Sequence, residues 1–281
     1  MIGFRVVNLL IPEDPSTVVL ETSQGLWTLE SAAELPRVRS AIDEGRCAHT
    51  YALFHDVSLS AGAAVVEQIV AELLPICLGA SFFTGHAVTV GAPLPESDIA
   101  FVSHSSRFPR ERGLIGPGPC VSSSEGFASR LQTFIANYGT LGAREKITVI
   151  VHHWLDALAC WSLEDLYLSA TTVLQVISAT EKDRQQKKKL SFADGVRGAA
   201  NHVSSPPPPT NFQTMRNDLI HEGRLSGSKF ANKSRSECAG LVASVLNWVD
   251  AYLHAALALG AVERERFDAT TLEHQLNAYS F

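Results

Sequence analysis

Long apolar stripes at helical spacing dominate the second half of the chain. In residues 147–158, 163–177 and 238–257 apolar side chains recur every three or four positions, the period of one face of an α-helix. Four consecutive prolines, Pro206–Pro209, interrupt this half, because proline cannot continue a helix. We therefore expect an all-α bundle of four or five helices, completed by shorter helices over 191–202 and 211–221.

The first half follows a different pattern, with short β-branched segments bounded by turns. Residues 4–11, 17–22 and 26–29 favour strands, and 51–59, 82–90 and 99–103 are further strand candidates. Helices are expected over 36–45, 61–78 and 127–138. The helix over 61–78 carries Glu67, Gln68 and Glu72, so we expect it to pack on the sheet and not to span a membrane.

These patterns predict an α+β protein of two parts. A small mixed α/β domain over residues 1–140 precedes a helical domain over 141–281. The whole net charge of −6 lies in the first part, where 14 acidic residues outnumber 8 basic ones. A protein that coats nucleic acid is usually basic, because phosphate contacts provide most of the non-specific affinity. The charge balance excludes that class.

One local basic cluster remains in the second part. Lys187, Lys188 and Lys189 follow Lys182 and Arg184, with Arg197 nearby, and are the candidate RNA-binding residues. The alternative role for this cluster is a solvated loop that keeps the protein soluble.

Metal, cofactor and disulfide chemistry receive little support. The five cysteines show no paired spacing, so neither a zinc site nor a disulfide framework is expected. His152, His153 and Asp156 could bind a metal from one helix, but such a pair more often has a packing or surface role. We expect no cofactor and no metal. No cleavable signal sequence is recognised at Met1, which predicts a cytoplasmic protein.

The segment Arg216–His221 carries the candidate chemistry. Thr210 and Gln213 predict a capping box that starts a helix near Asn211, and Gly223 predicts where this helix ends. Asn217 and His221, four residues apart, then share one face, whereas Arg216 lies about 140° round the helix from His221. Arg216 must reach around the helix or meet a histidine of another chain.

The stretch Phe212–Gly223 resembles the Arg-Asn-x-x-x-His-x-Gly signature of HEPN domains. These are helical bundles of prokaryotic toxins, antiphage defence proteins and RNA-targeting CRISPR effectors. The likeness extends over about residues 145–260, and its specific part is the motif. It implies a metal-independent endoribonuclease in which two copies of the chain, as a homodimer, bring Arg216, Asn217 and His221 to one composite site on RNA.

The resemblance also implies supporting residues and partners. Glu164 or Asp165 would support the motif from an early helix, and the first domain would recognise a trigger or an antitoxin. The alternative is a non-catalytic binding or dimerisation module. In that case Arg216 would pair with Asp218, Glu222 or a carboxylate on a neighbouring helix, and His221 would be a structural imidazole.

Overall fold

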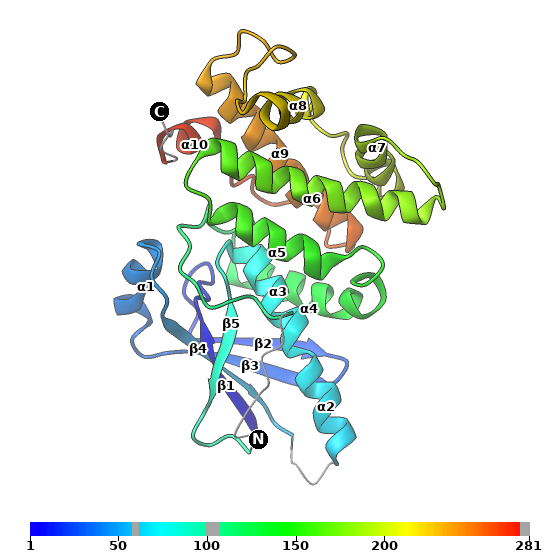
Figure 1. The fold of residues 1–281 in the computed structure, drawn as a ribbon. Coiled ribbons are helices and arrows are strands. Elements are labelled where there is room, and N and C mark those ends of the chain that lie inside the picture. Colours follow the sequence, from blue (N-terminus) through cyan, green and yellow to red (C-terminus); the bar gives the residue numbers. More distant parts are fainter. Residues whose placement is uncertain (58–61, 99–106, 276–281) are drawn as a thin grey trace. The chain divides into compact units, whose positions relative to one another are not determined.

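The computed structural model describes residues 1–57, 62–98 and 107–275. The chain divides into two compact units, Met1–Thr140 (unit 1) and Leu141–Phe281 (unit 2). Unit 1 holds a five-stranded antiparallel sheet with helices, and the described part of unit 2 is helical (Figure 1). The expected α+β class, with the sheet first and the helical region second, is confirmed.

The sheet of unit 1 is built from β1 (Ile2–Val7), β2 (Thr17–Thr22), β3 (Gly25–Ser31), β4 (His49–His55) and β5 (Thr89–Pro93), in the order β2-β3-β4-β1-β5. Neighbouring strands pair antiparallel. In β2 exposed and buried residues alternate, as expected for a strand with one face against a core. Phe4, Leu20, Trp27 and Leu53 are fully buried and form the centre of that core.

The helices of unit 1 are α1 (Leu35–Asp43), α2 (Ala63–Ala71), α3 (Leu73–Thr84) and α4 (Ser124–Leu141). The prediction of a strand from Phe82 is wrong, because Phe82–Thr84 forms the last turn of α3. The ring of Phe83 packs edge-on against Phe127 and Phe134 of α4, and this burial outweighs the β-propensity of the aromatic residues. The strand candidate over 99–103 lies outside the described residues.

One stretch of unit 1 is long and apolar enough to cross a membrane. It comprises α2 and α3 together, Ala63–Thr84, and half of it is buried within the protein. Glu72 lies between the two helices, and its carboxylate accepts hydrogen bonds from Trp27 Nε1 and from Thr22 Oγ1, both at 2.8 Å. These bonds tie the stretch to the sheet.

Unit 2 contains α5 (Ile147–Leu158), α6 (Leu163–Arg184), α7 (Phe192–Val203), α8 (Phe212–Glu222), α9 (Arg235–Ala256) and α10 (Ala269–Gln275). The long helix α6 contacts α5, α7, α8 and α9. Gly195 of α7 lies against Ser178 of α6, and Gly198 lies against Glu181. The two helices therefore run in the same direction, and the loop between them leads back along α6.

Candidate functional site

Helix α8 carries the motif and packs against α6 (Figure 1). Its end is as predicted: Gly223 adopts φ +71° and its amide donates to the carbonyl of Leu219 at 3.1 Å. The predicted capping box at its start is wrong. Asn211 is the N-cap residue, in the left-handed region with φ +69°, and no side chain caps the helix.

Tertiary contacts position α8 in place of a local cap. The hydroxyl of Tyr167, on α6, donates to the carbonyl of Phe212 at 2.5 Å. Trp248 Nε1, on α9, donates to the carbonyl of Pro206 at 2.7 Å and so anchors the proline run that leads into the helix. Both donors come from long helices of the bundle, which fixes the direction in which α8 begins.

Arg216 lies against an aromatic platform. Its guanidinium carbon is 4.4 Å from the ring centroid of Phe192, the first residue of α7, and the Phe192 ring contacts Phe212. Burial raises the pKa of Tyr167 well above its usual range, and the positive charge of Arg216 lowers it in part. Arg216 makes no ion pair with a carboxylate of the described residues, and its buried Nε has no hydrogen-bond partner there.

His221 and Asn217 are more accessible. His221 is exposed in the last turn of α8, and Asn217, one turn earlier, is half-buried. Neither side chain forms a hydrogen bond with the residues that the structure describes. The imidazole and the amide are therefore available to a ligand or to another chain.

Asp218 has a different environment. This carboxylate is 1% exposed and accepts hydrogen bonds from the amides of Gly227, Lys229 and Phe230 at 3.0, 3.2 and 2.6 Å. A Cβ at Gly227 would lie 2.8 Å from the Asp218 carboxyl carbon, so only glycine fits. Asp218 thus holds the loop after α8 and does not pair with Arg216.

Glu222 holds the same loop from its outer side. Its carboxylate accepts from the amide and the hydroxyl of Ser228 and from Arg224. The Ser228 hydroxyl, followed by Arg224, lowers the pKa of Glu222 to about 2. The pairing of Arg216 with Asp218 or Glu222, expected for a purely structural motif, is absent from the described residues.

The lysine cluster lies in the exposed loop between α6 and α7. Lys189 precedes Phe192 by three residues, so their Cα atoms are at most about 11 Å apart. The cluster is nevertheless smaller than the sequence suggests, because Arg184 pairs with the buried carboxylates of Glu145 and Glu181. Lys187, Lys188 and Lys189 remain exposed in the loop that leads to Phe192.

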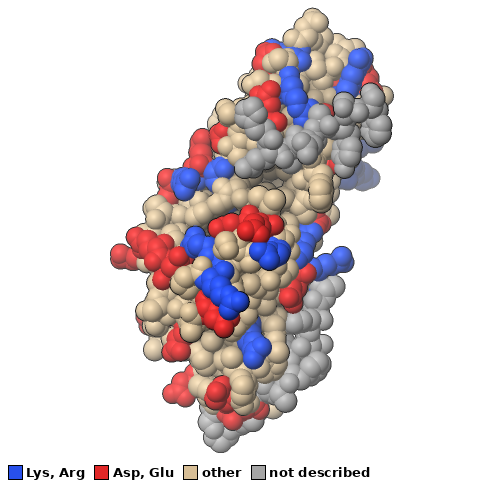
Figure 2. Space-filling model, turned by 90° about the vertical axis from the view of Figure 1, so that its left-hand side faces the viewer, with Lys and Arg blue, Asp and Glu red and all other residues tan. Residues whose placement is uncertain are grey.

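The face drawn in Figure 2 shows Lys and Arg among Asp and Glu, without one continuous basic stripe. Attraction of nucleic acid to this protein would therefore depend on local cations more than on a general field.

The two acidic candidates on α6 have other contacts. Glu164 lies 3.6 Å from Arg235 of α9, and the amide of Asp165 is capped by Ser162. Among the described contacts, neither carboxylate joins Arg216. The residues that contact the motif helix here are Tyr167 and Phe192. In the sequence Tyr167 is one position of an apolar stripe, and Phe192 is the residue that follows the helix cap Ser191, so neither was identified as a neighbour of the motif.

No metal-binding site is formed in the part of the chain that the structure describes. No group of three or more His, Cys, Asp or Glu side chains is close enough to hold an ion there. His153 Nδ1 lies 4.0 Å from the carboxylate of Asp156, a contact between two partly exposed neighbours on α5. The five cysteines are free thiols.

Comparison of the chain with protein-family models, with curated proteins and with solved structures finds no match. The assignment of function therefore depends on the geometry and chemistry of α8.

Proposed function

We propose that the protein is a metal-independent endoribonuclease of the HEPN type that acts on RNA as a homodimer. The observation that carries the proposal is the division of polar residues on α8. Asp218 and Glu222 are bound by the following loop, whereas Arg216, Asn217 and His221 make no ion pair or hydrogen bond through their side chains with described residues. The residues left without such partners are those that the chemistry requires.

RNA carries its own nucleophile, the 2′-hydroxyl. Cleavage needs a base to remove its proton, an acid for the departing 5′-oxygen, and a cation for the charge that develops on phosphorus. His221 of one copy serves as the base, and His221 of the second copy serves as the acid. Arg216 stabilises the transition state, and Asn217 orients the phosphate or the imidazole ring.

A second copy is part of the proposal, because one copy of the motif supplies one imidazole, that of His221, and the chemistry needs two. The products are a 2′,3′-cyclic phosphate and a 5′-hydroxyl. Lys187, Lys188 and Lys189 contact the RNA backbone. The enzyme works in the cytoplasm as a toxin or in antiphage defence, and an antitoxin or a trigger protein controls it.

The second candidate is a non-catalytic binding or dimerisation module. The stacking of Arg216 on Phe192 and the burial of its Nε favour it, because they give this arginine a role in packing. The exposed His221 has no such role and favours the nuclease.

Expression in bacteria separates the two candidates. Induced wild-type protein is expected to arrest growth, and His221→Ala and Arg216→Ala are each expected to relieve the arrest. His202→Ala is the matched control, since His202 is also exposed in the last turn of a short helix. Equal toxicity of the wild type and both motif variants would refute the catalytic assignment.

A further inference from the structure

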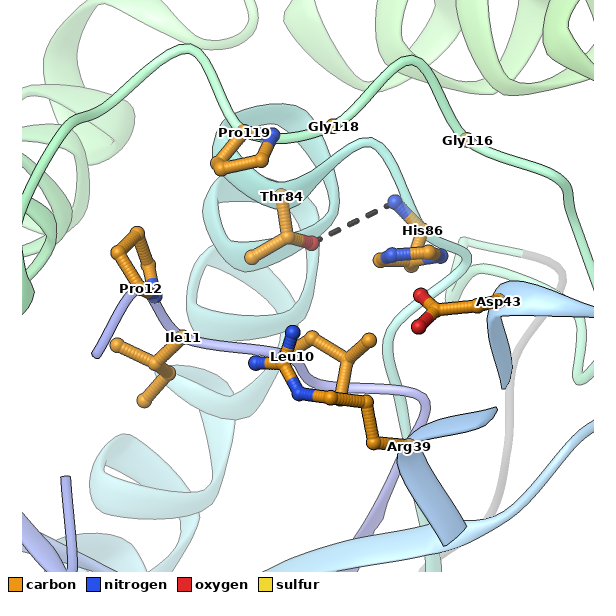
Figure 3. A pocket seen from close by; sticks show the side chains of 10 residues that line it. All are labelled: Leu10, Ile11, Pro12, Arg39, Asp43, Thr84, His86, Gly116, Gly118 and Pro119. Atoms are coloured by element: carbon orange, nitrogen blue, oxygen red, sulfur yellow. Dashed lines mark hydrogen bonds between the residues drawn. The ribbon is translucent and has the colours of Figure 1, made fainter. Parts of the chain in front are cut away.

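Unit 1 contains a small pocket apart from the motif, partly open to solvent on the side of the exposed residue Asp43. Its volume is about 280 Å³, near the lower end of the range for sites that bind small organic molecules. Four segments form its walls: the loop after β1, helix α1, the end of α3 with the residues that follow it, and a glycine- and proline-rich segment (Figure 3). The lining residues are Leu10, Ile11, Pro12, Arg39, Asp43, Thr84, His86, Gly116, Gly118 and Pro119.

The positive charge in the pocket has a partner within the protein. Arg39 pairs through Nη2 with Asp14, in the turn after β1. The negative charge does not. Asp43 makes no hydrogen bond or ion pair with any residue that the structure describes, and its carboxylate points into the pocket toward the ring of His86 (Figure 3).

The backbone adds to this negative character. Asp43 is the last residue of α1, and Thr84 is the last residue of α3. Two helix C-termini therefore border the pocket, each with the partial negative charge of its last carbonyls. An unpaired aspartate in the last turn of a helix is unfavourable by itself, and a bound cation would relieve the repulsion.

The remaining walls favour an organic cation over a metal ion. Leu10 and Ile11 are buried, and Pro12 and Pro119 complete an apolar surface. A metal ion would need several oxygen or nitrogen ligands. The pocket brings the Asp43 carboxylate and the His86 imidazole beside an apolar wall, and no group of three or more His, Cys, Asp or Glu that could hold a metal ion occurs among the described residues. A protonated amine or amidine attached to a small apolar group would match both features.

We propose that this pocket binds a small organic cation, an amine or amidine with an apolar group, through an ion pair with Asp43. Leu10, Ile11 and the two prolines contact the apolar group, and the helix ends at Asp43 and Thr84 strengthen the attraction. The proposal stands apart from the nuclease function, because every residue of the pocket lies in unit 1.

Small molecules of similar shape and opposite charge test whether the pocket prefers a cation. The full-length protein is titrated calorimetrically with phenethylamine, with benzamidine and with 3-phenylpropionate, which resembles phenethylamine in shape and carries the opposite charge. Asp43→Asn removes the carboxylate charge. Glu44→Gln is the control, because it removes the same charge from the next residue, whose carboxylate pairs with Arg46 at 2.6 Å and does not line the pocket.

We expect at least one of the two cations to bind saturably at low millimolar concentration, and the acid to bind at least about tenfold more weakly. Asp43→Asn should lower the affinity for the cation by about tenfold or more, the effect of losing a charge-assisted hydrogen bond, while Glu44→Gln leaves it unchanged. Thermal unfolding of both variants checks that they fold. Equal binding of acid and amine, equal affinity in Asp43→Asn and wild type, or no binding of either cation would overturn the proposal.

Discussion

Helix α8 and the pocket of unit 1 present charge in opposite ways. On α8 the carboxylates have partners: Asp218 binds three backbone amides and Glu222 binds Ser228 and Arg224. The basic groups of the motif, Arg216 and His221, make no ion pair among the described residues. In the pocket the order is reversed, since Arg39 pairs with Asp14 and Asp43 has no described partner. The charge that remains without a partner is positive at α8 and negative in the pocket. The ligand proposed for each place has the opposite charge, an anion at α8 and a cation in the pocket.

Removing the unpaired cation of α8 should have the largest effect. Arg216→Ala is expected to lower RNA cleavage by roughly 10²- to 10³-fold, the usual loss when a group that stabilises transition-state charge is deleted. The free energy of unfolding should fall by only about 1 kcal/mol, for the lost contact with Phe192. Arg216→Lys should restore little activity, because an ammonium lacks the planar fork of the guanidinium. If the Arg216→Ala variant cleaved RNA at the wild-type rate, the charge of Arg216 would have no catalytic role.

Removing a paired carboxylate should reduce stability. Asp218→Ala leaves two buried amides, of Gly227 and Phe230, and the part-buried amide of Lys229 without their acceptor. We expect the free energy of unfolding to fall by roughly 3 kcal/mol. Asp218→Asn keeps one acceptor oxygen, so its free energy of unfolding should lie between those of Asp218→Ala and the wild type. Chemical denaturation measures both. A change within experimental error for Asp218→Ala would mean that the loop does not depend on this carboxylate.

The aromatic platform should have a smaller effect. Phe192→Leu keeps an apolar side chain but removes the ring under Arg216, and we expect a several-fold loss of cleavage, corresponding to about 1 kcal/mol. Phe192→Tyr keeps the ring and should retain near wild-type activity. Equal activity of the leucine and tyrosine variants would show that the stacking does not position Arg216.

Removing the carboxylate charge of Glu222 should have the smallest effect, which should be visible in how the free energy of unfolding depends on pH. The pKa of Glu222 is lowered to about 2 in the folded protein, so the ionised form is favoured by folding. The contribution of Glu222 to the free energy of unfolding is present above the pKa of the carboxyl in the unfolded chain, about 4.3. It is lost as the pH falls through the folded pKa of about 2. The stabilities of wild type and Glu222→Gln should therefore differ at neutral pH and converge as the pH falls from about 4 to about 2. An NMR titration that finds an ordinary pKa for Glu222 would contradict its role in holding the loop.

Local patterns predicted much of the fold. The apolar stripes located α5, α6 and α9, and Gly223 marked the end of α8, because helix periodicity and glycine conformation are properties of a few neighbouring residues. The strand expected from Phe82 failed for the opposite reason. Contacts of Phe83 with Phe127 and Phe134 of α4, 44 and 51 residues later, decide the conformation of that segment.

The surroundings of the motif were predicted less well. Tyr167 reaches Phe212 across 45 residues, and Phe192 reaches Arg216 across α7 and the proline run. Asp218 was one of the possible partners of Arg216 under the alternative of a non-catalytic module, yet it binds amides 9 to 12 residues further on. One-dimensional spacing identifies which residues share a helix face, but it does not identify the partners that the bundle brings to that face.

The chemical ends of RNA from cells that express the protein test the central claim most directly. Cells receive wild type, His221→Ala or His202→Ala at matched levels, and ends with a 2′,3′-cyclic phosphate and a 5′-hydroxyl are sequenced. We predict that wild type and His202→Ala produce the same new ends, and that His221→Ala reduces them by roughly 10²- to 10⁴-fold without loss of soluble protein. New ends that persist undiminished in His221→Ala, or none in cells that express the wild type, would contradict the assignment of α8 as a ribonuclease site.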